Sequence, residues 1–147
     1  VIRTWPVFLR PLQESTKVIG VAPIKDHNLC QASMALKNWY GLLGGSRNRL
    51  HQKIDEVIAD LGAMITPTLV VLDGTRLLMR NGPTGGSLSD VAPGNTIVCG
   101  VDAVAVDAYG FTLLGRDPDA LGYLQQAHAR GIGNKNWQSL RWKEIGV

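Results

Sequence analysis

The sequence predicts an α/β fold with a mostly parallel sheet, or a mixed one, and helices on both faces. Three apolar strings have the length of buried strands and lie at residues 17–22, 68–72 and 96–100. Amphipathic segments alternate with them, which is typical of a sheet covered on both sides. The link between the second and third strings holds turn residues but no clear crossover helix, so an antiparallel pair also fits there. We expect one domain over residues 1–147.

Four helices are expected, each with a start signal in its first residues and all but the second ended by glycine. Their expected ranges are 29–40, 47–61, 103–114 and 118–130. The side chains of Asn28, Ser46 and Asp102 can accept hydrogen bonds from the free N–H groups of a first helical turn. Pro118 suits the first turn of the last helix, since proline has no N–H to leave unpaired.

The composition is that of an ordinary globular chain. Of the 147 residues 45% are hydrophobic and 18% are charged, and the net charge is +3. So small a basic excess does not predict nucleic-acid binding. No apolar run approaches the roughly 20 residues that cross a bilayer, so we expect a soluble protein with no membrane span.

The two cysteines, Cys30 and Cys99, stand far apart in the sequence. They are too few for this chain alone to hold an iron–sulfur cluster or a structural zinc ion. A disulfide is not required by the pattern, so the redox compartment stays open. Residue 1 is valine, so a segment removed before it would have carried any targeting signal. The sequence therefore fits either the prokaryotic cytoplasm or export.

Polar residues follow each predicted strand. Lys25, Asp26 and His27 come after the first strand, Asp73 after the second and Asp102 after the third. In open α/β sheets ligands bind beyond the carboxyl ends of the strands, so we expect these side chains to emerge side by side along one rim. Each has a structural alternative as well: Asp73 can begin a turn, Asp102 can cap a helix, and His27 can lie idle in solvent.

A group of basic and polar residues indicates a site for an anionic small molecule. The candidates for ligand contact are Lys25, His27, Lys37, Asn38, Arg47, Arg49 and Gly82. Basic side chains at a helix start are unfavourable unless an anion lies beside them. Glycine in the string 81–86 allows the backbone to approach a ligand closely, although a flexible turn explains that string equally. A solvated basic surface is the alternative for the group.

Proton transfer at such a site would fall to a histidine. His27 and His51 are the candidates, because the unperturbed pKa of histidine lies nearest neutrality. Lys25 is a further catalytic candidate.

Three aspartates, Asp73, Asp102 and Asp107, are candidate oxygen ligands for a divalent metal ion. Asp107 falls among apolar residues, where a carboxylate needs a partner. Lys25, Lys37 or a neighbouring backbone amide would serve.

Several strings together carry a family resemblance. They are Lys25-x-His27, Leu36-Lys37-Asn38-x-x-Gly41, His51, Asp60-Leu61, Leu72-Asp73-Gly74, Asn81-Gly82-Pro83 and Gly100-x-Asp102-x-Val104-Ala105-x-Asp107-Ala108. In this order they resemble the domain of unknown function 362 family, over about residues 17–133. The resemblance implies an association with ferredoxin-type iron–sulfur modules, and export signals in some members. It also implies that this chain is the C-terminal portion of a larger family domain.

The sequence therefore supports two hypotheses of function. The first is a small-molecule or metal-assisted enzyme domain, associated with redox chemistry, whose anion-binding site lies at the strand ends. The second is a non-catalytic domain that docks to an iron–sulfur or other redox protein, and it predicts an exposed apolar patch. A chain that is only the stabilising half of a larger fold is a third alternative.

Overall fold

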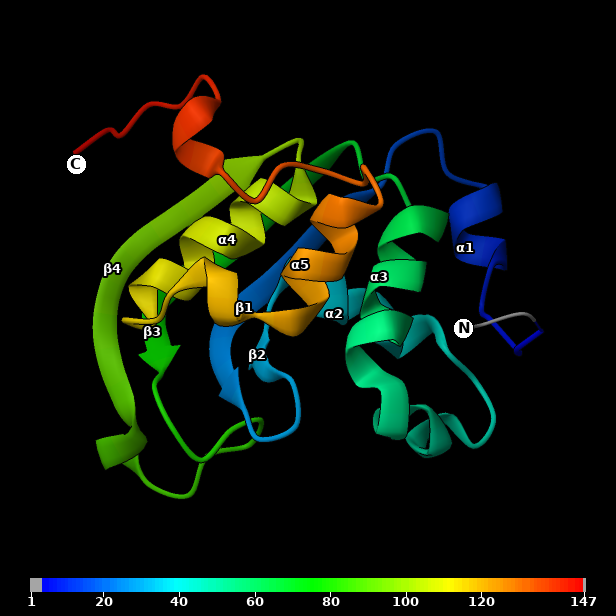
Figure 1. Cartoon of the computed structure of the whole chain (residues 1–147), viewed down its shortest axis with the longest axis horizontal. Helices are drawn as coiled ribbons and strands as arrows, with labels where there is room; N and C mark the ends of the chain where they lie inside the picture. Colours follow the sequence, from blue (N-terminus) through cyan, green and yellow to red (C-terminus); the bar gives the residue numbers. More distant parts are fainter. Residues whose placement is uncertain (1–3, 147) are drawn as a thin grey trace.

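A computed structural model describes residues 4–146 and contains one four-stranded mixed sheet (Figure 1). The strands are β1 (Ile19–His27), β2 (Gln31–Ser33), β3 (Leu69–Leu78) and β4 (Val91–Gly100), in the order β2-β1-β3-β4. β1 and β3 run parallel, whereas β2 and β4 are antiparallel to their neighbours. The predicted α/β class with a mixed sheet is confirmed.

Strands β3 and β4 are longer than the sequence suggested. The turn-rich stretch 75–93 was expected to lie outside the sheet, yet β3 continues to Leu78 and β4 begins at Val91. The pairing passes an irregularity between Gly74 and Arg76, where the register shifts. Since this link joins antiparallel neighbours, it needs no crossover helix. β1 likewise continues through Pro23 to His27, because β2 pairs with it only at residues 25–27 and leaves the proline on an edge.

Five α-helices complete the described chain: α1 (Arg10–Gln13), α2 (Ala35–Asn38), α3 (Ile54–Met64), α4 (Ala103–Leu113) and α5 (Gly122–Ala129). The described chain also has short 3-10 helices: η1 (Trp39–Leu42), η2 (Arg47–Lys53), η3 (Leu88–Asp90), η4 (Pro118–Ala120) and η5 (Trp137–Ser139). Of these, η1 continues α2 and η2 leads directly into α3. The helix expected over residues 29–40 is wrong in its first half. Asn28 does not cap it, because a turn there leads into β2, and the helix starts at Ala35. None of the helices described is long and apolar enough to cross a bilayer.

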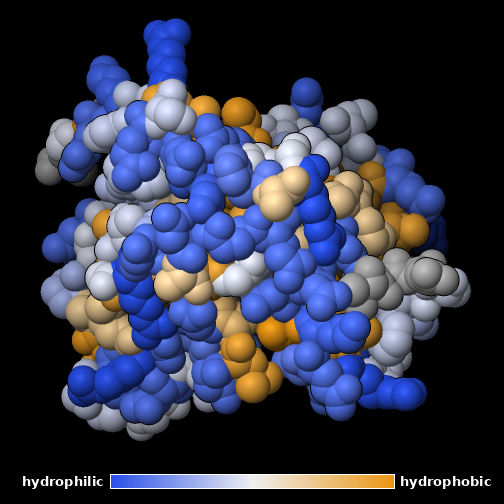
Figure 2. All heavy atoms as spheres, viewed as in Figure 1, coloured by the Kyte–Doolittle hydropathy of each residue, from blue (hydrophilic) through white to orange (hydrophobic). Residues whose placement is uncertain are grey.

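The helices α2 and α4 pack on one face of the sheet, and α5 and α3 pack against them and against each other (Figure 1). The core lies between that face and the helices and includes Ile24, Leu72, Phe111, Tyr123 and Leu124. Polar side chains cover most of the outer helical surface (Figure 2).

The opposite face of the sheet has no helical layer among the described residues, which differs from the expected cover on both sides. Along β1 burial alternates from residue to residue, and Ile19 and Val21 are 58% and 60% exposed. Burial also alternates along β4, where Ile97 is 55% exposed. Continuous apolar strings predict strands that are buried on both faces, but every second residue of β1 points to the uncovered face.

The cap predicted at Asp102 is confirmed. One of its carboxylate oxygens accepts the N–H groups of Val104 and Ala105 at 2.9 and 3.0 Å, at the start of α4. The other oxygen accepts the N–H of Asn134 at 2.8 Å and so ties the C-terminal segment to the helix.

We expect Asp102→Ala to lower the free energy of unfolding by about 1–2 kcal/mol, because it removes the cap of α4. Urea denaturation measures the change. Asp73→Ala is the matched control, since Asp73 is exposed and bonds only to nearby Thr75, and its loss should be smaller. Equal losses in the two variants would contradict the capping role.

Candidate functional site

A pocket of about 380 Å³ lies where the end of β1 meets α2, η1 and η2. Its lining consists of His27, Ser33, Lys37, Asn38, Tyr40, Gly41, Arg47, Asn48, His51 and Pro83. Two of these residues are cationic, two are histidines and none is acidic. The pocket therefore brings together five of the residues that the sequence suggested for a site.

The helix α2 supplies Lys37 and Asn38 to the pocket, and a buried carboxylate fixes its start. Asp107 of α4 accepts the N–H groups of Ala35 and Leu36 at 2.8 and 3.0 Å. Asp107 is fully buried, and this burial raises the pKa of its carboxyl to about 7, against the lowering effect of the two N–H bonds. Of the partners expected for Asp107, the backbone amides are the ones that the structure provides.

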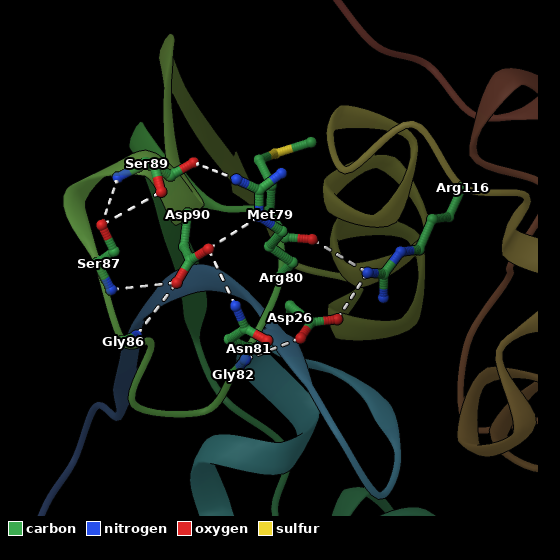
Figure 3. A network of polar contacts seen from close by, with 10 residues as sticks. All are labelled: Asp26, Met79, Arg80, Asn81, Gly82, Gly86, Ser87, Ser89, Asp90 and Arg116. Carbon is green, nitrogen blue, oxygen red and sulfur yellow. Dashed lines mark hydrogen bonds and ion pairs between the residues drawn. The ribbon is translucent and has the colours of Figure 1, made fainter.

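The loop after β3 forms another wall, and Asp26 holds it in place (Figure 3). The carboxylate of Asp26 accepts the N–H of Gly82 at 2.8 Å and pairs with the Arg116 guanidinium at 2.6 Å. In return the Gly82 carbonyl accepts the N–H of Asn28 at 3.2 Å. A Cβ at residue 82 would lie 1.8 Å from the main-chain oxygen of Asp26, so only glycine allows this approach. Pro83, the next residue, then faces the pocket.

A second carboxylate organises the rest of this loop. Asp90 accepts from Arg80 at 2.8 Å and from Asn81 at 3.0 Å, and its other oxygen accepts the N–H groups of Gly86 and Ser87 at 3.1 Å (Figure 3). The bonds from Arg80 and Asn81 lower the pKa of Asp90 to about 2. The loop is thus an ordered structure rather than the flexible turn that its glycines suggested.

His27 ends β1 and is only 5% exposed. Its Nδ1 accepts the N–H of Leu29 at 3.1 Å. The pKa of His27 is lowered to about 4, mainly because the ring is buried. The charges of Lys37, His51 and Lys25 also lower this pKa, and Asp26 raises it. The imidazole is therefore neutral at pH 7.

Tyr40 joins η1 to η2 on the far side of the pocket. Its hydroxyl donates to the Arg47 carbonyl at 2.6 Å and contacts Nδ1 of His51 at 3.2 Å. The same Nδ1 lies 3.1 Å from the Asn48 carbonyl. Lys37 lies over the Tyr40 ring, with Nζ 5.5 Å from its centre.

The two cations of the pocket have no carboxylate partner within residues 4–146. Arg47 reaches only the carbonyls of Tyr40 and Gly41, each at 3.5 Å. Partial burial lowers the pKa of Lys37, and so do the charges of Lys25 and Arg47, although Cys30 acts in the other direction. An anion in the pocket would relieve this repulsion.

The other suggested residues lie elsewhere. Lys25 lines a different hollow of about 440 Å³ on the uncovered face of the sheet, with Arg76 and mostly apolar neighbours. Arg49 is exposed and outside the pocket lining, and Gly82 is buried behind Pro83.

The expected single rim of Lys25, His27, Asp73 and Asp102 does not exist. β4 is antiparallel to β3, and Gly100 pairs with Val70, so Asp102 lies at the end of the sheet opposite to His27. Asp73 pairs with Pro23 inside the strands and is exposed. Strand direction, which short apolar strings do not reveal, is the reason for the error.

The three aspartates suggested as metal ligands are also apart. Asp102 caps α4, Asp107 binds α2 inside the core and Asp73 lies on the exposed face. Within residues 4–146, no three His, Cys, Asp or Glu side chains are grouped as a metal ion would need. Both cysteines are free thiols, and burial raises the pKa of Cys30 to about 12.

Sequence reasoning missed Ser33, Tyr40, Gly41, Asn48 and Pro83 as pocket residues. Tyr40 carried a usable signal, since it follows Lys37 by three positions and so shares its side of a helical turn. Pro83 and Asn48 depend on long-range loop contacts that no local pattern encodes.

Together the fold and the pocket define a small α/β domain with a basic pocket at the end of a parallel strand. The chain belongs to the family described as "Domain of unknown function (DUF362)", whose model matches residues 1–112. The resemblance is confirmed, although the match begins and ends earlier than residues 17–133. No curated protein and no solved structure matches this chain.

We expect His27→Gln to weaken the dependence of stability on acid pH. In the wild type the unfolded chain binds a proton near pH 6.5, whereas folded His27 does so only near pH 4, so the free energy of unfolding falls as the pH drops through this window. At about 1.4 kcal/mol per pKa unit, discounted for solvent screening, the effect is on the order of 2 kcal/mol. Urea denaturation at several pH values measures it. An unchanged pH dependence in the variant would contradict the buried, neutral state of His27.

Proposed function

We propose that this domain binds a small anionic molecule in the pocket and acts on it as an enzyme. The observation that carries the proposal is the pairing of Lys37 and Arg47 in a pocket whose lining has no acidic residue. Lys37 is partly buried and Arg47 is exposed beside it, so an anion between them would offset the desolvation of Lys37 and the repulsion between the two charges. Concave sites with a few convergent polar groups are the usual form of small-molecule sites.

The geometry gives separate roles to the two walls of the pocket. Lys37 and Arg47 would hold the negative group of the ligand, since both have N–H donors free of carboxylates in the described chain. His27 and His51 lie on the same pocket and would handle a proton, as neutral imidazoles can. Association with redox chemistry, which the family resemblance implies, belongs to this proposal as the setting of the reaction.

We expect Lys37→Gln and Arg47→Gln each to weaken the binding of inorganic phosphate by about tenfold, the effect of about 1.4 kcal/mol for a lost charged hydrogen bond. Arg76→Gln is the matched control, because Arg76 lies at the other hollow, on the uncovered face of the sheet. Calorimetric titration at low salt measures the affinities. If phosphate and acetate do not bind the wild type, or all three variants bind alike, the proposal fails.

The uncovered sheet face favours a second function, docking to an iron–sulfur or other redox protein. Its apolar side chains Ile19, Val21 and Ile97 are each more than half exposed. Lys25 and Arg76 lie further along the same face, in the hollow described above, and offer two cations to an acidic partner such as a ferredoxin.

For this second function we expect Ile97→Asp to abolish binding of an acidic ferredoxin that carries two iron–sulfur clusters. The added carboxylate would repel the partner and interrupt the apolar face. Ile145→Asp is the control, since Ile145 is 71% exposed in the C-terminal segment. Surface plasmon resonance measures the binding. Absence of wild-type binding, or equal loss in both variants, would exclude this role.

A further inference from the structure

We infer that the pocket takes an anion that also carries a hydroxyl group. The inference rests on the proposed function and concerns which anions the pocket prefers. It follows from the hydrogen-bonding state of three side chains, His27, Asn38 and His51, each of which has one polar atom already engaged by the backbone.

His51 presents an acceptor to the pocket. Its Nδ1 lies 3.1 Å from the Asn48 carbonyl, which can only accept, so Nδ1 carries the hydrogen. The neighbouring Tyr40 hydroxyl spends its own hydrogen on the Arg47 carbonyl and is no competing donor. In the neutral ring Nε2 therefore holds a lone pair, and no described side chain or backbone group donates to it.

His27 has the opposite tautomer. Its Nδ1 accepts the N–H of Leu29, a group that can only donate, so in the neutral ring the hydrogen resides on Nε2. Burial and the adjacent cations keep this ring neutral, because they lower its pKa. His27 is thus a fixed donor and cannot take a proton at Nε2, which leaves His51 as the proton acceptor of the pair.

Asn38 supplies a second acceptor. Its Nδ2 donates to the Val21 carbonyl at 3.1 Å, which orients the amide and leaves Oδ1 without a donor among the described residues. The pocket consequently offers acceptors at Asn38 and His51 alongside the donors of Lys37, Arg47 and His27.

A ligand that has only acceptor atoms, such as acetate, would satisfy the donors and leave the two acceptors unpaired. Asn38 is exposed and His51 half-buried, so water reaches both acceptors until a ligand covers them. Polar groups that a ligand covers without pairing cost affinity, and a site with such groups discriminates against a ligand that lacks the matching group. A hydroxyl group next to the negative charge supplies the missing hydrogen. Hydroxycarboxylates and hydroxyalkyl phosphates share this chemistry.

Two matched pairs of probes test the inference: glycolate against acetate, and glycerol phosphate against propyl phosphate. We expect the hydroxylated member of at least one pair to bind about tenfold more tightly, the worth of one hydrogen bond of about 1.4 kcal/mol. The pair that shows the preference identifies the anion as a carboxylate or a phosphate. Equal affinities within both pairs would overturn the hydroxyl inference and leave the anion site standing. If no probe binds, the proposed function fails and the inference fails with it.

Variants then assign the preference to one ring. His51→Phe should abolish the preference for the hydroxylated probe, because the acceptor for its hydroxyl group is lost. Arg76→Gln, at the other hollow, should keep the preference. Long-range ¹⁵N spectra of the wild-type protein give a readout that needs no ligand. A hydrogen on Nε2 of His51, or on Nδ1 of His27, would overturn the inference even if His51→Phe is poorly folded.

Discussion

The buried carboxylate of Asp107 is the contact on which the cationic wall of the pocket depends. It accepts the first N–H groups of α2, a helix of four residues that cannot be stable by itself. Because α2 takes its position from this contact, Lys37 and Asn38 are placed by α4, far along the chain. The charged carboxylate is costly there, as the raised pKa of Asp107 shows, and its two N–H bonds offset that cost in part.

Asp26 is the carboxylate that positions the opposite wall of the pocket, the loop after β3. Its two oxygens join the end of β1 to the loop at Gly82 and to Arg116 beyond α4, so three distant segments meet at one carboxylate (Figure 3). The consequence for the site is that Pro83 of the loop and His27 of β1 line the same pocket. Both walls thus depend on buried acids that face away from the pocket, which leaves the pocket itself basic.

Local patterns predicted those parts of the fold and of the site that depend on local physics. The three strands, the cap at Asp102 and the buried face of α3 follow from apolar runs, a capping side chain and helical spacing. Strand direction and the β1–β2 turn depend on which segments pair, and this is why Asp102 was expected beside His27. Arg47 and His51 were found because basic side chains at a helix start are unfavourable without an anion. The positioning roles of Asp26 and Asp107 were missed because their partners, Gly82, Arg116 and the first residues of α2, are distant in sequence.

The antiparallel direction of β4 explains why the pocket lies at the end of β1 alone rather than across several strand ends. Because β4 is antiparallel to β3, the carboxyl ends of the strands, where ligands usually bind, are divided between the two opposite ends of the sheet. Only the end of β1 is enclosed, by α2, η1 and the ordered loop after β3. Leu36 and Trp39 anchor the helices around the pocket in the core, and polar contacts orient its donors and acceptors. The opposed tautomers of His27 and His51 are the result, since each ring has one nitrogen bound to the backbone of its own wall.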